Sequence, residues 1–400
     1  MSSPKTVRWG ILATGGIALT FTRDLLCDPT TRGVNHLKHT VVAAASSTSE
    51  SRAKDFLKEV GAPSDAKAYG SYEEFVKNPD IDVVYIATPH SHHYQNAMLC
   101  LEAGKNVLCE KAFTVNAAQA RKLAEVARSK NLFLMEAVWT RYFPLSIYVR
   151  EQITAGRIGP VTRVLSDNSM ALDPEKNFAD GKNRMVNPDL AGGALLDLGI
   201  YALTWVYQTI YHTQPEKTRQ APQLQAFVKN YEPTGMADEH STVILRFPRS
   251  KEEGGEAHAV ATTSIRVATS YGGNMDAPFV RIQGPLGEIQ VFGASFRPLS
   301  TKIITKDGKV ESKEFPIPGP GKGSGWYNGF GGSLQSEGEG QGMFWEADEA
   351  ADAIINGRKE GRFLGLDESV LIMEAMDEVR KQGGLVYPDK IETLDYPTQL

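Results

Sequence analysis

Short apolar runs alternate with helical patterns over the first third of the chain. The runs are bounded by turn or charged residues, which is typical of strands that are buried on both faces of a sheet. They cover residues 6–12, 39–45, 82–88, 106–110 and 132–135. One intervening helical pattern, 116–130, places Ala120, Leu123, Ala124 and Ala127 on one face. Repeated strand–helix alternation predicts a doubly wound parallel sheet.

The pattern changes after residue 140. A helix at 144–155, a strand at 161–170, a polar loop at 173–188 and an apolar helix around 192–201 are expected first. Six later segments alternate or cluster apolar residues between Gly/Pro turns, as antiparallel strands do. These segments are 223–229, 241–247, 257–267, 279–283, 288–291 and 301–305, and the helices 343–356 and 367–382 close the chain.

The predicted fold class is therefore α/β with two domains. An N-terminal Rossmann domain would span residues 1–140, and residues 141–400 would form an α+β domain for substrate binding and dimerisation. The second domain would contain a large, open, mostly antiparallel sheet, and its final helix would be free to pack back on the first domain. The glycine-rich run 316–342 contains the segment 321–324, which resembles a P-loop only superficially and is interpreted as a flexible loop.

The composition gives no sign of a nucleic-acid or membrane partner. The 400 residues include 43 basic and 48 acidic ones, so there is no basic field for a polyanion. No apolar run reaches the ~18 residues of a membrane span, and residues 1–5 lack the apolar core of a signal peptide. Cys27, Cys100 and Cys109 show no paired spacing. We therefore expect a soluble, cytoplasmic protein.

A glycine-rich turn lies between the first strand and the first helix, which is the context of a dinucleotide-binding fingerprint. Its residues are Ala13, Thr14, Gly15, Gly16 and Ile17. Glycines let backbone N–H groups approach a pyrophosphate, and the helix N-terminus adds partial positive charge. Because Ala13 stands where the fingerprint has its first glycine, an ordinary tight turn is the alternative.

Hydroxyl groups follow the second strand, where an NAD-selective site usually has a carboxylate. They belong to Ser46, Ser47 and Thr48, and Arg52 lies in the first turn of the next helix. Hydroxyl donors and a guanidinium suit a 2′-phosphate, so the pattern favours NADP. Ser49 can cap the same helix without conflict.

Two further strand ends carry polar residues. Thr88 and Pro89 precede a cluster of histidines at positions 90, 92 and 93, and Glu110–Lys111 ends the strand at 106–110. A metal site at the histidines is disfavoured because no complementary ligands stand at a recognisable spacing. Ligands of open α/β sheets bind at the carboxyl ends of the strands, so Lys111 is expected at the mouth of the site.

Asp197 and Tyr201 are four residues apart on the apolar helix and would share one face. Taken alone, the pair could be either a buried structural hydrogen bond or part of a site.

These motifs together resemble the Gfo/Idh/MocA oxidoreductases over nearly the whole chain. The resemblance rests on residues 10–18, on 86–89 with His93, on Glu110–Lys111 and on Asp197-x-Gly199-x-Tyr201. Residues 136–144 are similar to the branch that contains NADP-dependent D-xylose 1-dehydrogenases and dimeric dihydrodiol dehydrogenases. Ala13 and Ala112 depart from the family pattern, which has glycine and proline there.

The resemblance implies a set of site residues. Lys111 and Tyr201 would carry the chemistry, with Asp197 orienting the substrate or the lysine. The cofactor would be bound by residues 13–17 and 46–48, by Arg52, Thr88, Pro89, His90, His93, Glu110 and Lys111, and by Ala137. The substrate would contact Trp139, Arg141, Phe143, Arg184, Asp197 and Tyr201. A nearby ammonium would favour the phenolate of a tyrosine whose pKa is ordinarily near 10.

The function expected from these residues is NADP-dependent oxidation of the C1 hydroxyl of an aldopyranose, with D-xylose first, to the lactone. A trans-dihydrodiol of an arene is the alternative substrate, and a catalytically inactive NADP sensor that regulates transcription is the alternative from another class. The open face of the large sheet, expected to be apolar, predicts a two-fold homodimer.

Overall fold

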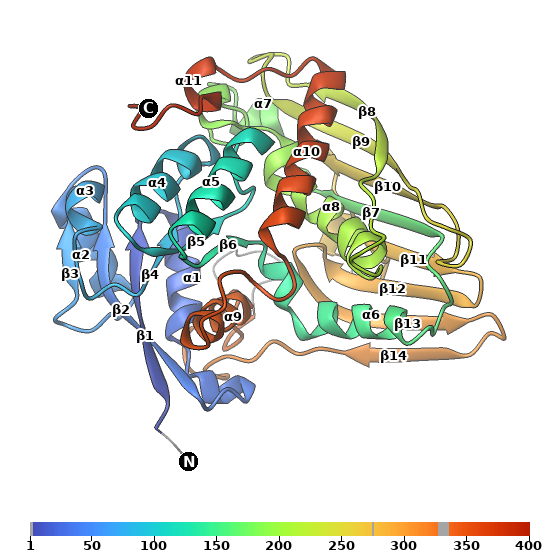
Figure 1. The fold of residues 1–400 in the computed structure, drawn as a ribbon, viewed down its shortest axis with the longest axis horizontal. Coiled ribbons are helices and arrows are strands. Elements are labelled where there is room, and N and C mark those ends of the chain that lie inside the picture. Colours follow the sequence, from blue (N-terminus) through green and yellow to red (C-terminus); the bar gives the residue numbers. More distant parts are fainter. Residues whose placement is uncertain (1–2, 274–275, 327–335) are drawn as a thin grey trace.

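The computed structural model describes residues 3–273, 276–326 and 336–400, and two sheets organise them (Figure 1). The first is a six-stranded parallel sheet with strand order β3-β2-β1-β4-β5-β6. Its strands are β1 (Lys5–Leu12), β2 (Leu37–Ala45), β3 (Lys67–Tyr69), β4 (Val83–Ile86), β5 (Asn106–Glu110) and β6 (Leu134–Ala137). The order reverses between β1 and β4, and such a switch point opens a ligand crevice at the carboxyl ends of the strands.

Helices on both faces of this sheet connect its strands. They are α1 (Gly16–Leu26), α2 (Glu50–Glu59), α3 (Tyr72–Phe75), α4 (His90–Glu102) and α5 (Ala117–Ser129). Side-chain caps fix where several of them begin: Ser49 Oγ accepts from Arg52 N, and Asn116 Oδ1 accepts from Gln119 N at 2.9 Å.

The second sheet has eight strands in the order β14-β13-β12-β11-β7-β10-β9-β8, and within it only the β7–β10 pair is parallel. The strands are β7 (Arg163–Ser169), β8 (Gln223–Asn230), β9 (Asp238–Phe247), β10 (Ala257–Ser264), β11 (Val280–Gly284), β12 (Gly287–Ala294), β13 (Arg297–Thr305) and β14 (Val310–Glu314). The predicted pairing of a Rossmann sheet with a large, mostly antiparallel sheet is confirmed. The sequence patterns missed β3 and β14.

Three helical segments lie across one face of this sheet in Figure 1: α6 (Pro144–Thr154), α8 (Ile200–Val206) and α10 (Leu366–Gly383). The helix that contains α8 is apolar and long enough to span a membrane by length and composition over 188–211, yet 94% of its most apolar window is buried inside the fold. It is therefore the core helix of the second domain.

The last two long helices connect the two sheets. Before α9 (Phe344–Ile355), the N–H groups of Gln341, Gly342 and Met343 all donate to the carboxylate of Asp24 on α1, at 2.7–2.8 Å. On α10, Asp377 accepts from the N–H of Ala117 at the start of α5, at 2.8 Å. These bonds attach the C-terminal helices to the helices of the first sheet.

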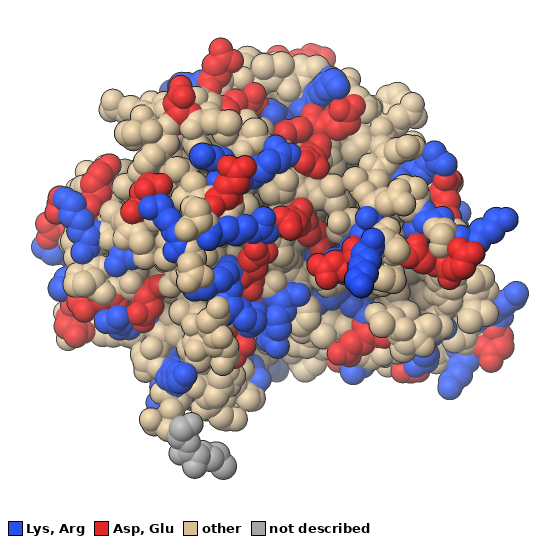
Figure 2. All heavy atoms as spheres, in the orientation of Figure 1, with Lys and Arg blue, Asp and Glu red and all other residues tan. Residues whose placement is uncertain are grey.

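The glycine-rich run 316–342 is only partly described, because residues 327–335 lie outside the described residues. Its flanks are bonded to one another, since Gly321 N donates to the carbonyl of Gly338 at 3.0 Å. On the face of the molecule drawn in Figure 2, basic and acidic side chains are interspersed.

Candidate active site

The turn after β1 is shaped for a diphosphate. Ala13 has a φ of 85°, in the left-handed region, which glycine enters without steric cost and alanine at roughly 1–2 kcal/mol. A Cβ added at Gly15 or Gly16 would meet no heavy atom within 4 Å, so the backbone is open here. No side chain caps α1 and no acidic residue stands in its first turn. Its free N–H groups fit a dinucleotide phosphate, with Thr14 and Ile17 partly exposed beside them.

The segment after β2 presents the predicted hydroxyls. Ser46 is buried, and its Oγ accepts from Thr48 N at 3.2 Å, which fixes the turn. Ser47, Thr48 and Arg52 are exposed at the start of α2. The guanidinium of Arg52 makes no ion pair within the described part of the chain. Two exposed hydroxyls and an exposed guanidinium without an ion pair among the described residues lie at one strand end, and this set fits a 2′-phosphate.

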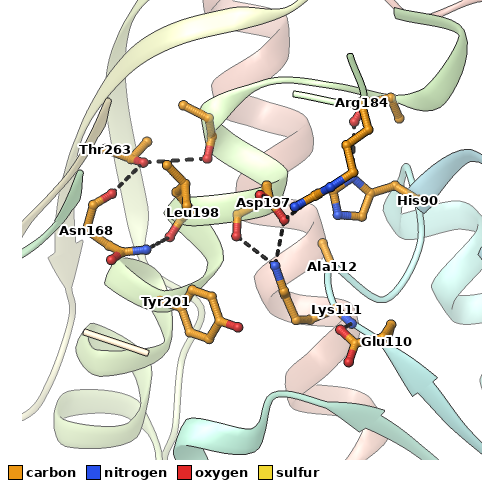
Figure 3. Close-up of polar contacts among 12 residues, drawn as sticks. His90, Glu110, Lys111, Ala112, Asn168, Arg184, Asp197, Leu198, Tyr201 and Thr263 are labelled. Atoms are coloured by element: carbon orange, nitrogen blue, oxygen red, sulfur yellow. Dashed lines mark hydrogen bonds and ion pairs between the residues drawn. The ribbon is translucent and has the colours of Figure 1, made fainter. Parts of the chain in front are cut away.

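The Lys111 ammonium lies at the end of β5, against the helix that carries Asp197 (Figure 3). Its Nζ donates to the Asp197 carbonyl oxygen at 2.8 Å and to Asp197 Oδ1 at 2.7 Å. Arg184, from the preceding loop, contacts the same carboxylate at 3.1 Å. Burial raises the pKa of Asp197, but the charges of Lys111 and Arg184 more than offset it and hold that pKa well below its usual range. Asp197 is therefore ionised between two cations.

Tyr201 lies on the same helix, and its phenol oxygen accepts from Trp139 Nε1 at 2.6 Å. Burial, followed by the charge of Glu110, raises the pKa of Tyr201 well above 10. Lys111 Nζ lies 5.0 Å from the ring centroid, over the ring face, while its hydrogen bonds go to Asp197. The ammonium thus does not hold Tyr201 as a phenolate in this structure, contrary to our expectation.

The histidines at the start of α4 differ in role. His93 is buried, and its two ring nitrogens lie 2.9 Å from the carbonyl oxygens of Ala112 and Thr88, so the ring joins the ends of β4 and β5. His90 Nδ1 lies 3.1 Å from the Ala191 carbonyl oxygen, and burial lowers its pKa to about 3. His90 is therefore neutral and stands beside the Asp197 cluster (Figure 3).

Three of the predicted cofactor contacts lie beneath the surface of the crevice. Glu110 accepts from the Tyr85 hydroxyl at 2.5 Å and from Lys111 N at 3.1 Å. Ala137 and His93 are both 0% exposed, and Glu110 is 4% exposed. These buried residues shape the backbone around the site, and their contact with a cofactor stays a prediction. Thr88 and Pro89, in contrast, are at least partly exposed at the end of β4.

Two predicted substrate contacts also need correction. Arg141 is 0% exposed, and its guanidinium bonds to Glu368 on α10 at 2.5 Å and to the Phe363 carbonyl oxygen at 2.9 Å. Phe143 is 1% exposed and packs behind Trp139, at 5.5 Å between ring centroids. Both residues hold the turn 139–142 in place. Trp139 itself reaches the site through its bond to Tyr201.

One aromatic residue at the site was missed. Phe296, between β12 and β13, packs at 5.8 Å from Tyr201 and 6.0 Å from Trp139 between ring centroids. It arrives through a hairpin of the second sheet, and a single phenylalanine in a turn carries no sequence signal. Only the fold could have placed it here.

The Rossmann crevice, with a lysine at a strand end that contacts an Asp/Tyr helix from the second sheet, defines a nicotinamide-dependent oxidoreductase. Residues 7–138 match the oxidoreductase family with an NAD-binding Rossmann fold, GFO_IDH_MocA, and residues 147–290 match the GFO/IDH/MocA C-terminal domain. The chain belongs to the Gfo/Idh/MocA family of oxidoreductases.

Individual relatives match almost end to end. The chain is 52% identical over 395 residues to the D-xylose 1-dehydrogenase (NADP(+)) of Hypocrea jecorina, covering 98% of this chain and 95% of that one. It is 36% identical over 384 residues to the trans-1,2-dihydrobenzene-1,2-diol dehydrogenase of Homo sapiens, covering 96% and 98%. The fold is similar to that of an aldose-aldose oxidoreductase from Caulobacter crescentus, with a TM-score of 0.70 at 21% identity over 95% and 98% of the two chains.

Proposed function

We propose that this protein oxidises the C1 hydroxyl of an aldopyranose, with D-xylose as the first candidate, to the lactone, using NADP. The observation that carries the proposal is the contact between Lys111, Asp197 and Arg184 beside Tyr201 at the carboxyl end of β5. Several polar groups converge there, as recognition of a sugar with several hydroxyls requires. The 52% identity to a D-xylose 1-dehydrogenase (NADP(+)) supports the same substrate and cofactor.

NADP would be held by the two strand ends described above. The backbone of residues 13–17 would bind the diphosphate at the start of α1. Ser47, Thr48 and Arg52 would bind the 2′-phosphate, since all three are exposed at the end of β2. When bound, the nicotinamide accepts the hydride from C1 of the sugar.

The side chains of this chain must orient the hydroxyl and remove its proton. Tyr201 Oη is the proton acceptor that we assign, because the Trp139 N–H already donates to it and the Lys111 cation lies over its ring. Burial and Glu110 oppose loss of the phenol proton. Alkaline pH would therefore favour oxidation, while the neutral phenol is suited to donate a proton in the reverse direction. Asp197 fixes the ammonium of Lys111, and the side chain of Arg184, also paired with Asp197, is 57% exposed to solvent.

A trans-dihydrodiol is the second candidate substrate, because Trp139, Phe296 and Tyr201 form an aromatic wall that suits a flat ring. An inactive sensor would have no need of the Lys111–Asp197 ion pair. The test is the ratio of kcat/KM for D-xylose to that for benzene dihydrodiol, measured with NADP in one buffer. We expect a ratio well above one; a ratio well below one would favour the dihydrodiol. No turnover of either substrate with tight NADP binding would support the sensor.

A cytoplasmic location is proposed with the function. It is supported by Cys27, Cys100 and Cys109, which are all free thiols.

A further inference from the structure

Asp197 lies in an irregular part of its helix. Residues Leu195–Gly199 form a π-helical turn, in which the N–H of Ile200 bonds to the carbonyl of Leu195, five residues back. Such turns interrupt the regular ladder of an α-helix and are frequent at functional sites. Asp238, on β9, fixes the start of this one by accepting from Leu195 N at 2.8 Å.

Two consecutive carbonyl groups of this turn accept side-chain donors from different domains (Figure 3). The Asp197 carbonyl accepts from Lys111 Nζ at 2.8 Å, from the Rossmann side of the crevice. The Leu198 carbonyl accepts from Asn168 Nδ2 at 2.9 Å, from the second sheet. The turn is thus held between the catalytic lysine and one amide group of β7.

Asn168 is itself fixed. Its side chain is buried, with the residue 3% exposed, and its backbone carbonyl oxygen accepts from the Thr263 hydroxyl on the neighbouring strand β10 at 2.8 Å. The turn also packs closely on this sheet, since a Cβ added at Gly199 would lie 3.2 Å from Thr263 Cγ2. A side chain at residue 199 would make a tight contact with Thr263, so the glycine in Asp197-x-Gly199-x-Tyr201 allows the turn to lie close to β10.

We propose that Asn168 is a positioning residue for catalysis: by binding the Leu198 carbonyl it fixes the turn whose Asp197 carbonyl and carboxylate hold the Lys111 ammonium. The inference deepens the proposed function and rests on it. Without the amide, the Leu198 carbonyl loses a buried donor and the turn can move toward water. Misplacement of a catalytic group by about 1 Å can lower turnover by about 100-fold.

The test compares two substitutions with a control on the same strand and face. Asn168→Leu replaces the amide donor with an apolar side chain of similar length, while Asn168→Asp keeps the shape of the side chain. Ser166→Ala is the control, because the Ser166 hydroxyl is buried without a partner and lies two residues away. For Asn168→Leu we expect kcat to fall roughly tenfold to 100-fold, with less than about a threefold change in KM for D-xylose and in Kd for NADP. The deuterium isotope effect on kcat with D-xylose deuterated at C1 should rise, because hydride transfer becomes slower.

Asn168→Asp provides a readout that a purely structural role would not move. A buried carboxyl that is protonated can donate to the Leu198 carbonyl, whereas a carboxylate cannot. The kcat of Asn168→Asp should therefore come closer to that of the wild type as pH falls from 8 to 6. A rise in KM for D-xylose at unchanged kcat, or wild-type kinetics in both variants, would overturn the proposal. Absence of aldose turnover by the wild type would instead contradict the proposed function.

Discussion

At the scale of single residues, the charge of Lys111 is directed to Asp197 and not to the phenol oxygen of Tyr201. The ammonium makes two hydrogen bonds to Asp197, and the same carboxylate is paired with Arg184. This arrangement keeps a cation at the strand end in a fixed position, 5.0 Å from the ring centroid of Tyr201. Asp197 therefore determines where the Lys111 ammonium lies relative to Tyr201.

Removal of this cation should reduce turnover and leave cofactor binding intact. We expect Lys111→Met to lower kcat by roughly 10²–10⁴, because the cation beside the proton acceptor Tyr201 would be lost and Asp197 would keep only one of its two cationic partners, Arg184. Steady-state kinetics and NADP titration measure the two effects separately. Lys122→Met, at an exposed position of α5, is the matched control. Turnover of Lys111→Met near the wild-type level would remove Lys111 from the mechanism.

Cofactor choice depends on residues at the end of β2. We expect at least about tenfold higher kcat/KM with NADP than with NAD, which corresponds to about 1.4 kcal/mol. Arg52→Ala should narrow this difference, since Arg52 is the exposed cation next to Ser47 and Thr48. Lys54→Ala on the same helix, where Lys54 pairs with Glu50, should leave it unchanged. Equal kcat/KM of the wild type with NAD and with NADP would contradict this prediction.

At the scale of elements, the buried strands were predictable and the irregular ones were not. The apolar run that ends at Glu110 was recognised because both faces of β5 are covered. In contrast, β14 is a mostly exposed edge strand, Val310–Glu314, with three charged residues, so its sequence reads as a loop. A hydrophobic pattern marks buried positions, and β14 has no buried residue.

Some features of the site were also predictable from the sequence, and others were not. Lys111 and Asp197 were predictable because family motifs mark them at a strand end and on a helix. The π-helical turn was not, because its bonds come from Asn168 and Asp238, which lie on separate strands of the second sheet. Arg141 was assigned to the substrate because it lies in residues 136–144, which resemble the xylose and dihydrodiol dehydrogenase branch. Its partner Glu368 lies 227 residues away in sequence, so the buried ion pair could not be seen.

A buried carboxyl between elements makes stability depend on pH. Glu136, at the end of β6, accepts from Phe113 N at 3.0 Å and is 1% exposed. Burial raises its pKa from 4.5 to about 7. The folded chain therefore binds a proton that the unfolded chain releases near pH 4.5, so the stabilisation is complete below that pH and is lost as pH rises through about 7.

Glu136→Gln should remove this dependence, because an amide keeps the acceptor for Phe113 and does not titrate. The two pKa values differ by about 2.5, which corresponds to about 3 kcal/mol of unfolding free energy. Between pH 4.5 and 8, the wild type should lose about that much more stability than the variant in urea unfolding. Glu216→Gln, at an exposed position, is the control. Parallel stability curves for wild type and Glu136→Gln would contradict the account.

At the scale of the whole molecule, the face of the second sheet opposite α6, α8 and α10 is the open surface. It was expected to be apolar, and it is mixed. Phe227 is 70% exposed and Ile244 is 43% exposed, on neighbouring strands, but Arg246 and His258, which pair with each other across β9 and β10, are exposed on the same face. We propose that this face forms a two-fold homodimer, in which exposed apolar residues are buried and charges can pair across the axis.

Sedimentation analysis tests this assembly. The wild type should sediment at twice the chain mass at micromolar concentration, and Phe227→Glu should shift it toward one chain mass by placing a charge in the interface. Val386→Glu is the control, since Val386 is 62% exposed and lies after α10, outside the sheet. A wild type that sediments as a single chain would refute the dimer.

Transfer of deuterium from C1 of D-xylose to the cofactor would show whether the protein oxidises the C1 hydroxyl. The protein would be incubated with NADP and D-xylose deuterated at C1, and both products would be analysed by NMR and mass spectrometry. If Lys111, Asp197 and Tyr201 serve oxidation at C1, the deuterium should appear at the nicotinamide of the reduced cofactor, one per molecule of lactone or aldonate formed. Reduced cofactor without deuterium, or an oxidised sugar that keeps deuterium at C1, would contradict the account.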